Sequence, residues 1–278
     1  MPFFMRTPAI RIRLFGLPLR RKDWYRRVRT IILVHGLMGT EDVHYAGCRR
    51  WWSRPVVEVR LPGHGAEPGV PEHPAASAIS RVRKSITDQP APPVVVGLSY
   101  LGAAVAFHAA RNEPGAVAGV VMAGYSFLVS PDMLTRWLQG FTGMAARQRR
   151  ARDHFADLHG RKWEDLLTAT FDELADGCLS LPGLDDLRRF DAPLQLVNGA
   201  LLQNERRAIE PAAASGADVT VIAGAGHVVP VDAPRMFAAA VEDFSDRIDT
   251  ECTVFHERRR AAARRSSTDA SVEEDARV

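Results

Sequence analysis

Residues 94–104 read Val-Val-Val-Gly-Leu-Ser-Tyr-Leu-Gly-Ala-Ala and join a β-branched apolar run directly to a run of small residues. The first half is typical of a buried β-strand, and the second half favours an α-helix. Ser99 falls at the junction. A sharp turn between a strand and a helix lifts a side chain out of both elements and into a cleft, which is where a nucleophile has to stand. The stretch therefore predicts an α/β fold with a serine at the carboxyl end of one of its strands.

Short apolar runs alternate with helical patterns on both sides of this stretch. This alternation indicates an α/β fold class with a mostly parallel central sheet and helices on both faces. The expected strands are Thr30–Val34, Pro55–Arg60, Pro93–Leu98, Val117–Ala123, Pro193–Val197 and Asp218–Ile222. The expected helices are Glu41–Trp52, Pro74–Asp88, Tyr100–Arg111 and Ala233–Ile248.

The rhythm changes after Gly124, where the pattern is helical as far as about residue 189 with no strand candidate. We interpret residues 126–190 as an inserted helical lid, between a first core part at 1–125 and a second at 191–249. Residues 250–278 are charged and rich in alanine, serine and arginine, which predicts a disordered tail. Near the start, residues 10–14 read as an edge strand and residues 17–24 as its hairpin partner.

Composition bounds the classes of function. The 278 residues carry a net charge of +3 and no run near the length of a membrane span, so we expect no transmembrane helix. Arginines crowd the first 29 residues and recur at 258–265, but without a nucleic-acid motif, so we expect no nucleic-acid partner. Three widely spaced cysteines fit neither a disulfide framework nor a zinc site, and predict a cytoplasmic protein. The sequence leaves the oligomeric state open.

Several short motifs occur in an order that resembles the α/β-hydrolase family over roughly residues 9–248. They are Val34-His35-Gly36-Leu37-Met38-Gly39, Leu61-Pro62-Gly63-His64-Gly65, Gly97-Leu98-Ser99 and Gly226-His227. The resemblance implies an α/β-hydrolase fold and a serine hydrolase activity.

The resemblance also implies roles for individual residues. Ser99 is the candidate nucleophile and His227 the candidate base, because a serine hydroxyl needs an adjacent base at neutral pH. The backbone N–H groups of Leu37 and Tyr100 are the candidate oxyanion hole. His35 reads as a loop-ordering residue, and no catalytic role is assigned to other histidines. We expect a small-molecule substrate, no cofactor and no metal.

The chain departs from the family pattern in two places. The family's acid is expected three residues beyond Gly199, where the chain has Leu202, and Glu205 is the substitute that we name, with Asp132 as the other nearby carboxylate. The usual Gly-x-Ser-x-Gly elbow has Leu101 at its second glycine.

Three functions follow from these observations. The first is a hydrolase that cleaves an ester or thioester of a small apolar substrate, since the segment 126–190 is rich in aromatic residues. The second is a lyase or cyclase that uses His227 as a base on the same fold. The third is a ligand-binding protein without turnover. The missing acid favours the second and third, whereas the retained serine and histidine favour the first.

Overall fold

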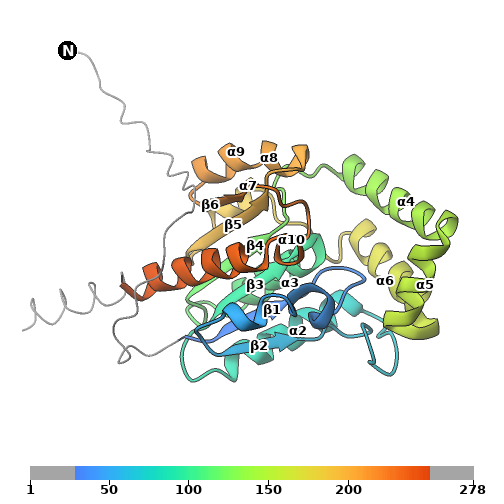
Figure 1. Cartoon of the computed structure of the whole chain (residues 1–278), viewed down its shortest axis with the longest axis horizontal. Helices are drawn as coiled ribbons and strands as arrows, with labels where there is room; N and C mark the ends of the chain where they lie inside the picture. The colour runs from blue at the N-terminus through green and yellow to red at the C-terminus, as the bar shows by residue number, and fades with distance from the viewer. Residues whose placement is uncertain (1–28, 251–278) are drawn as a thin grey trace, which may run out of the picture.

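The computed structural model describes residues 29–250, which build one parallel sheet with helices packed around it (Figure 1). The sheet has six strands in the order β2-β1-β3-β4-β5-β6, and every neighbouring pair is parallel. This confirms the predicted fold class. The strands are β1 Ile31–Val34, β2 Val56–Val59, β3 Val94–Leu98, β4 Gly119–Ala123, β5 Leu194–Gly199 and β6 Asp218–Ile222.

The helices agree with the sequence pattern except near the start, where the expected helix Glu41–Trp52 is broken. It ends as an α-helix at Tyr45 and continues after a turn as a single 3₁₀ turn, Arg49–Trp51. The α-helices are α1 Glu41–Tyr45, α2 Pro74–Thr87, α3 Ser99–Arg111, α4 Pro131–Arg147, α5 Arg149–His159, α6 Trp163–Ala175, α7 Leu184–Arg188, α8 Gln203–Arg207, α9 Ile209–Ala214, α10 Val229–Asp232 and a last helix over residues 234–250.

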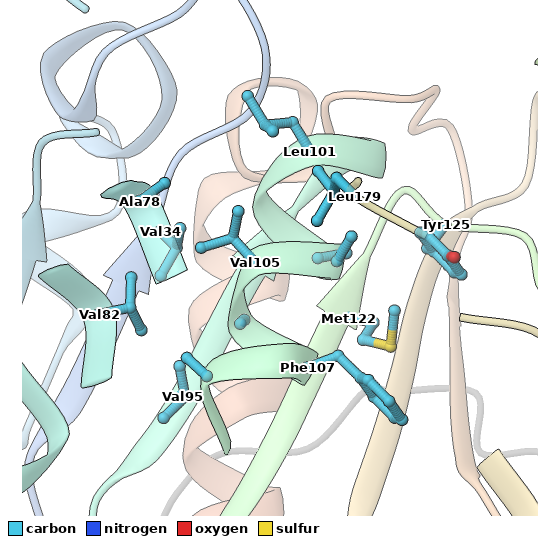
Figure 2. Close-up of a cluster of buried hydrophobic side chains, with 14 of the residues drawn as sticks. Val34, Ala78, Val82, Val95, Leu101, Val105, Phe107, Met122, Tyr125 and Leu179 are labelled. Atoms are coloured by element: carbon cyan, nitrogen blue, oxygen red, sulfur yellow. The ribbon is translucent and has the colours of Figure 1, made fainter. Parts of the chain in front are cut away.

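Both faces of the sheet are buried, as the continuous β-branched runs require. Alternate residues of β1 enter different apolar clusters: Ile32 and Val34 pack with α2 and α3, whereas Leu33 packs with the helix over 234–250. Figure 2 shows the first cluster, in which Val105 of α3 lies among side chains from the strands and from α2. The helix over 234–250, red in Figure 1, crosses the other face.

Close packing between α3 and the strands explains the unusual elbow sequence. A Cβ added to Gly97 would lie 2.3 Å from the carbonyl oxygen of Gly102, and one added to Gly102 would lie 2.5 Å from that of His35. Gly102 therefore takes the crowded position that the family pattern gives to the residue before it. Leu101 is free to be large because it points into a pocket, at 3% exposure.

The segment between β4 and β5 forms the helices α4, α5 and α6, which extend to one side of the sheet (Figure 1). Within residues 29–250, no helix has the length and hydropathy needed to cross a membrane. The predicted edge strand at 10–14, its hairpin partner at 17–24, most of the N-terminal arginines and the predicted tail lie outside the described residues, apart from position 250. The proposed division into domains stays a prediction.

Candidate active site

The candidate residues come from separate segments of the chain at the carboxyl edge of the sheet. Ser99 follows β3, Leu37 follows β1, Glu205 lies on α8 after β5, and His227 lies in the loop after β6. The chain leaves β1 toward β2 on one side and returns to β3 on the other. In open α/β sheets, such a switch in strand order creates a crevice beside the carboxyl ends of the strands. Parallel strands therefore bring residues 128 positions apart, Ser99 and His227, into hydrogen-bond contact.

Ser99 has a left-handed backbone conformation, with φ at 61°. This conformation costs a residue with a Cβ roughly 1–2 kcal/mol. Gly36 allows it, since a Cβ at that position would lie only 2.9 Å from the Cβ of Ser99. Backbone strain of this kind persists where the surrounding structure enforces it, and it occurs often at functional sites. The sharp turn anticipated between the strand and the helix is thus present.

Three side chains form a continuous hydrogen-bonded line. Ser99 Oγ lies 2.7 Å from His227 Nε2, and His227 Nδ1 lies 2.6 Å from Glu205 Oε1. The carboxylate of Glu205 can only accept, so the imidazole carries its proton on Nδ1 and leaves Nε2 free to accept from the serine hydroxyl. The geometry selects the tautomer in which His227 can act as a base toward Ser99.

Glu205 reaches the histidine from one turn of helix α8, and its side chain is completely buried. Asn198, at the end of β5, donates through Nδ2 to the carbonyl oxygens of Tyr125 and Glu205, at 2.8 and 3.4 Å. Leu202 takes no part in this line of hydrogen bonds, and Asp132 lies exposed at the start of α4. The carboxylate that meets His227 is therefore Glu205, three residues beyond Leu202 along the chain.

Two glycines admit the loop that carries His227. A Cβ at Gly124, where φ is +59°, would lie 2.3 Å from the carbonyl oxygen of His227. A Cβ at Gly199 would lie 2.2 Å from that of Ala225. The carboxylate of Asp232 accepts a 2.8 Å hydrogen bond from the backbone N–H of Gly226, so it braces this loop. The histidine is therefore fixed by backbone packing as well as by Glu205.

The side chain of Tyr100 makes contacts that the sequence did not indicate. Its ring lies parallel to that of His227, with centroids 5.9 Å apart and planes 21° apart, and it also packs against Trp137. Its hydroxyl oxygen accepts a 3.4 Å hydrogen bond from Asn204, the neighbour of Glu205. Burial, and to a smaller extent the charge of the nearby Glu205 carboxylate, raises the pKa of the Tyr100 hydroxyl above the usual range for a phenol. Tyr100 therefore contacts both the imidazole of His227 and helix α8, which carries Glu205.

The loop after β1 is ordered by histidines. His35 is fully buried; its Nε2 accepts from the N–H of Leu61 at 3.0 Å, and its Nδ1 donates to the Gly36 carbonyl. Burial is the main cause of a lowered pKa at His35, and the nearby His64 adds to it, so the imidazole of His35 is neutral. This agrees with the loop-ordering role expected for it. Leu37, the other candidate donor of the oxyanion hole, lines the same pocket as Ser99.

A pocket of about 410 Å³ opens over Ser99 and His227. Its wall is mostly apolar, and the segment between β4 and β5 supplies much of it. Among the aromatic residues of segment 126–190, Trp137, Phe141 and Phe171 line the pocket. Trp163 is absent from the wall and packs against Phe155, with ring centroids 5.7 Å apart. The lining residues include Leu37, Met38, Val43, His44, Leu98, Tyr100, Leu101, Leu134, Leu138, His154, Leu174 and Val228. The described residues contain no cluster of metal-ligating side chains.

Comparison with known proteins agrees with this architecture. The model of the alpha/beta hydrolase family matches residues 31–240. NosK from Streptomyces actuosus is 33% identical, with a TM-score of 0.73 over 80% of this chain and 99% of its own. The esterase RhEst1 from Rhodococcus sp. ECU1013 is 17% identical, with a TM-score of 0.58 over 80% of this chain and 91% of its own. MenH from S. aureus is 12% identical, with a TM-score of 0.61 over 79% of this chain and 94% of its own.

No curated protein matched the chain. The family model spans most of the described residues, and its span includes Ser99, Glu205 and His227. The identity with NosK extends over nearly the whole of that protein. The chain belongs to the alpha/beta hydrolase family.

Proposed function

We propose that this hydrolase cleaves an ester or thioester of a small, largely apolar molecule with Ser99 as its nucleophile. One observation carries the proposal: the hydrogen-bonded line from Ser99 Oγ through His227 to the buried carboxylate of Glu205. A serine, a base and an acid that orients the base are the parts that acyl transfer through a serine requires.

The chemistry follows from these positions. His227 Nε2 takes the hydroxyl proton as Ser99 Oγ attacks the substrate carbonyl, and the oxyanion accepts hydrogen bonds from the N–H groups of Leu37 and Tyr100. The first N–H groups of helix α3 have no carbonyl partner within the helix, so the N–H of Tyr100 is suited to that use. The bond to the leaving group then breaks, and His227 returns the proton to it. Water repeats the sequence on the acyl-serine and releases the acid.

The pocket supports an apolar substrate. Aromatic and aliphatic side chains make up most of its wall, and the volume of about 410 Å³ is in the range of sites for small molecules. The esterase RhEst1 has the same fold, which is consistent with ester cleavage here.

Glu205 weighs against the alternative of a binding protein, and the 2.7 Å hydrogen bond between Ser99 Oγ and His227 Nε2 favours a serine nucleophile over a lyase or cyclase that needs only a base. Burying a carboxylate is costly unless it is paired, and this one faces the imidazole nitrogen opposite Ser99. A pocket that only binds ligands has no need of that arrangement.

Labelling with a fluorophosphonate tests the proposal. The wild-type chain should react in a stoichiometric way, and both Ser99→Ala and His227→Ala should abolish labelling while the chain remains folded. A folded wild-type chain that does not label, or labelling that survives Ser99→Ala, would contradict it. Ser126→Ala is a matched control, since Ser126 is a buried serine near the end of β4 that is absent from the pocket wall.

A further inference from the structure

His44 has no role in the line of hydrogen bonds described above, yet it lies in the pocket wall beside it. A Cβ at Gly36 would be 2.9 Å from the Cβ of Ser99 and 3.5 Å from Cε1 of His44. The two side chains therefore flank the same point, and their separation cannot exceed these two distances combined. His44 is thus close enough to reach the first few atoms of any acyl group or leaving group held at Ser99.

The hydrogen bonds of the loop decide which nitrogen of His44 carries the proton. The backbone N–H of Gly36 donates to His44 Nδ1 at 3.2 Å, so Nδ1 has to be the bare nitrogen. A neutral imidazole has one proton, and here it belongs to Nε2. Burial, with a smaller contribution from the neighbouring His227, lowers the pKa of His44 to about 4. The ring is therefore neutral at physiological pH.

Nε2 has no hydrogen-bond acceptor among residues 29–250. It also differs from the Nε2 atoms of His64 and His159, which are sealed from solvent. His44 lines the pocket and is 9% exposed, and its Nε2 lies beside Gly39, where a Cβ would be 2.5 Å away. Since this nitrogen is neither partnered nor sealed from solvent, its N–H can be reached by a small acceptor. Most of the surrounding wall is apolar, so a directional donor at this place discriminates between ligands.

We propose that His44 is a specificity-determining residue, whose Nε2–H donates to an oxygen or nitrogen acceptor of the substrate within a few bonds of the carbonyl attacked by Ser99. This rests on the proposed function for the position of that carbonyl. The substrate would then be an apolar ester or thioester that carries one such acceptor near its reacting bond, rather than a plain hydrocarbon ester.

A matched pair of ligands separates this role from simple apolar binding. Butyrate and methoxyacetate esters have nearly the same shape, but the second has an ether oxygen in place of one methylene. His44→Asn keeps an acceptor for the Gly36 N–H and loses the donor at the Nε2 position, whereas His44→Gln places an amide donor near that position. The measured quantity is the ratio of kcat/KM for the p-nitrophenyl methoxyacetate and butyrate esters.

We expect His44→Asn to lower this ratio by about 3- to 10-fold, the value of one hydrogen bond, and His44→Gln to restore part of it. Comparing this ratio in the variant with the ratio in the wild-type chain cancels the different intrinsic reactivity of the two esters. An unchanged ratio, or equal losses on both esters, would overturn the role of His44 and leave the proposed hydrolase intact.

The same comparison is made without turnover in a Ser99→Ala chain, where NMR titration gives the affinities of phenyl methoxyacetate and phenyl butyrate. This readout decides the proposal even if the wild-type chain cleaves neither ester. We expect the preference for the methoxyacetate to fall when His44→Asn is added. If that variant does not fold, long-range ¹H–¹⁵N spectra of the Ser99→Ala chain should show His44 protonated at Nε2, with that signal shifted by the methoxyacetate alone. A bare Nε2, no difference between the ligands, or no detectable binding of either would refute the proposal.

Discussion

Replacing Glu205 by glutamine tests its proposed role as the acid that orients His227. The carboxylate is completely buried, and Oε1 lies 2.6 Å from His227 Nδ1. Glutamine has nearly the same size, but its amide group supplies no charge to the imidazolium that forms when Ser99 gives up its proton. It can also present N–H groups to Nδ1, which favours the wrong tautomer of His227.

The size of the effect follows from the chemistry of serine hydrolases. Removing the orienting acid of a serine protease lowers kcat by about 10⁴, or about 5.5 kcal/mol of barrier. We expect Glu205→Gln to lower kcat by about 10³- to 10⁴-fold, because the rest of the site stays in place. KM should change little, since Glu205 is absent from the pocket wall. Stability should fall only slightly, because Oε2 of Glu205 has no partner within residues 29–250.

The assay is hydrolysis of p-nitrophenyl butyrate, with the rate of fluorophosphonate labelling as a second readout. Asp132→Asn is the matched control, because Asp132 is the other carboxylate that the sequence offered, and it lies exposed on α4. Retention of more than about a tenth of kcat by Glu205→Gln would refute the assignment, since a triad acid contributes far more than that. A large loss in Asp132→Asn would refute it as well.

Three further outcomes are expected. Gly102→Ala should destabilise the fold by about 1–3 kcal/mol in urea titrations, because the added Cβ would lie 2.5 Å from the His35 carbonyl oxygen. Gly140→Ala should be neutral or stabilising, because a Cβ at this helical position would lie in open space. Burial lowers the pKa of His64 to about 4, so the unfolded chain binds more protons than the folded chain below the ordinary histidine pKa. Lowering the pH from about 7 to about 5 should therefore cost the wild type about 2 kcal/mol more unfolding free energy than His64→Asn, and equal costs would contradict this. Trp137→Ala should enlarge the pocket and raise the ratio of octanoate to butyrate ester hydrolysis about tenfold, and an unchanged ratio would place the acyl chain elsewhere.

The local pattern was sufficient for the fold. Buried parallel strands need continuous β-branched runs, and those runs are visible in the residues of β1, β3 and β4 without any tertiary information. The broken helix after Tyr45 shows the limit of such reasoning. The 3₁₀ turn that replaces its second half, Arg49–Trp51, carries a contact between Arg49 and Glu58 that a helical pattern does not reveal.

The candidate site divides in a similar way. Ser99 and His227 stand in local motifs, since a strand, a tight turn and a helix dictate the first and a glycine-rich loop carries the second. The roles of Leu37 and Tyr100 in an oxyanion hole stay predictions, although both residues line the pocket. The stacking of Tyr100 on His227 and the donor on His44 had no signal in the sequence, because each depends on the partner that lies opposite.

The sequence by itself determined the parallel sheet, the sharp turn at Ser99 and the family, because each depends on neighbours along the chain. Only the tertiary structure decided that Glu205 faces His227, since the contact joins helix α8 to the loop after β6, 22 positions along the chain. Several exposed carboxylates have the same local chemistry, but the packing of α8 beside β5 buries this one against the imidazole. A buried charge is tolerated only where it is paired, and the pairing partner is brought to it by folding.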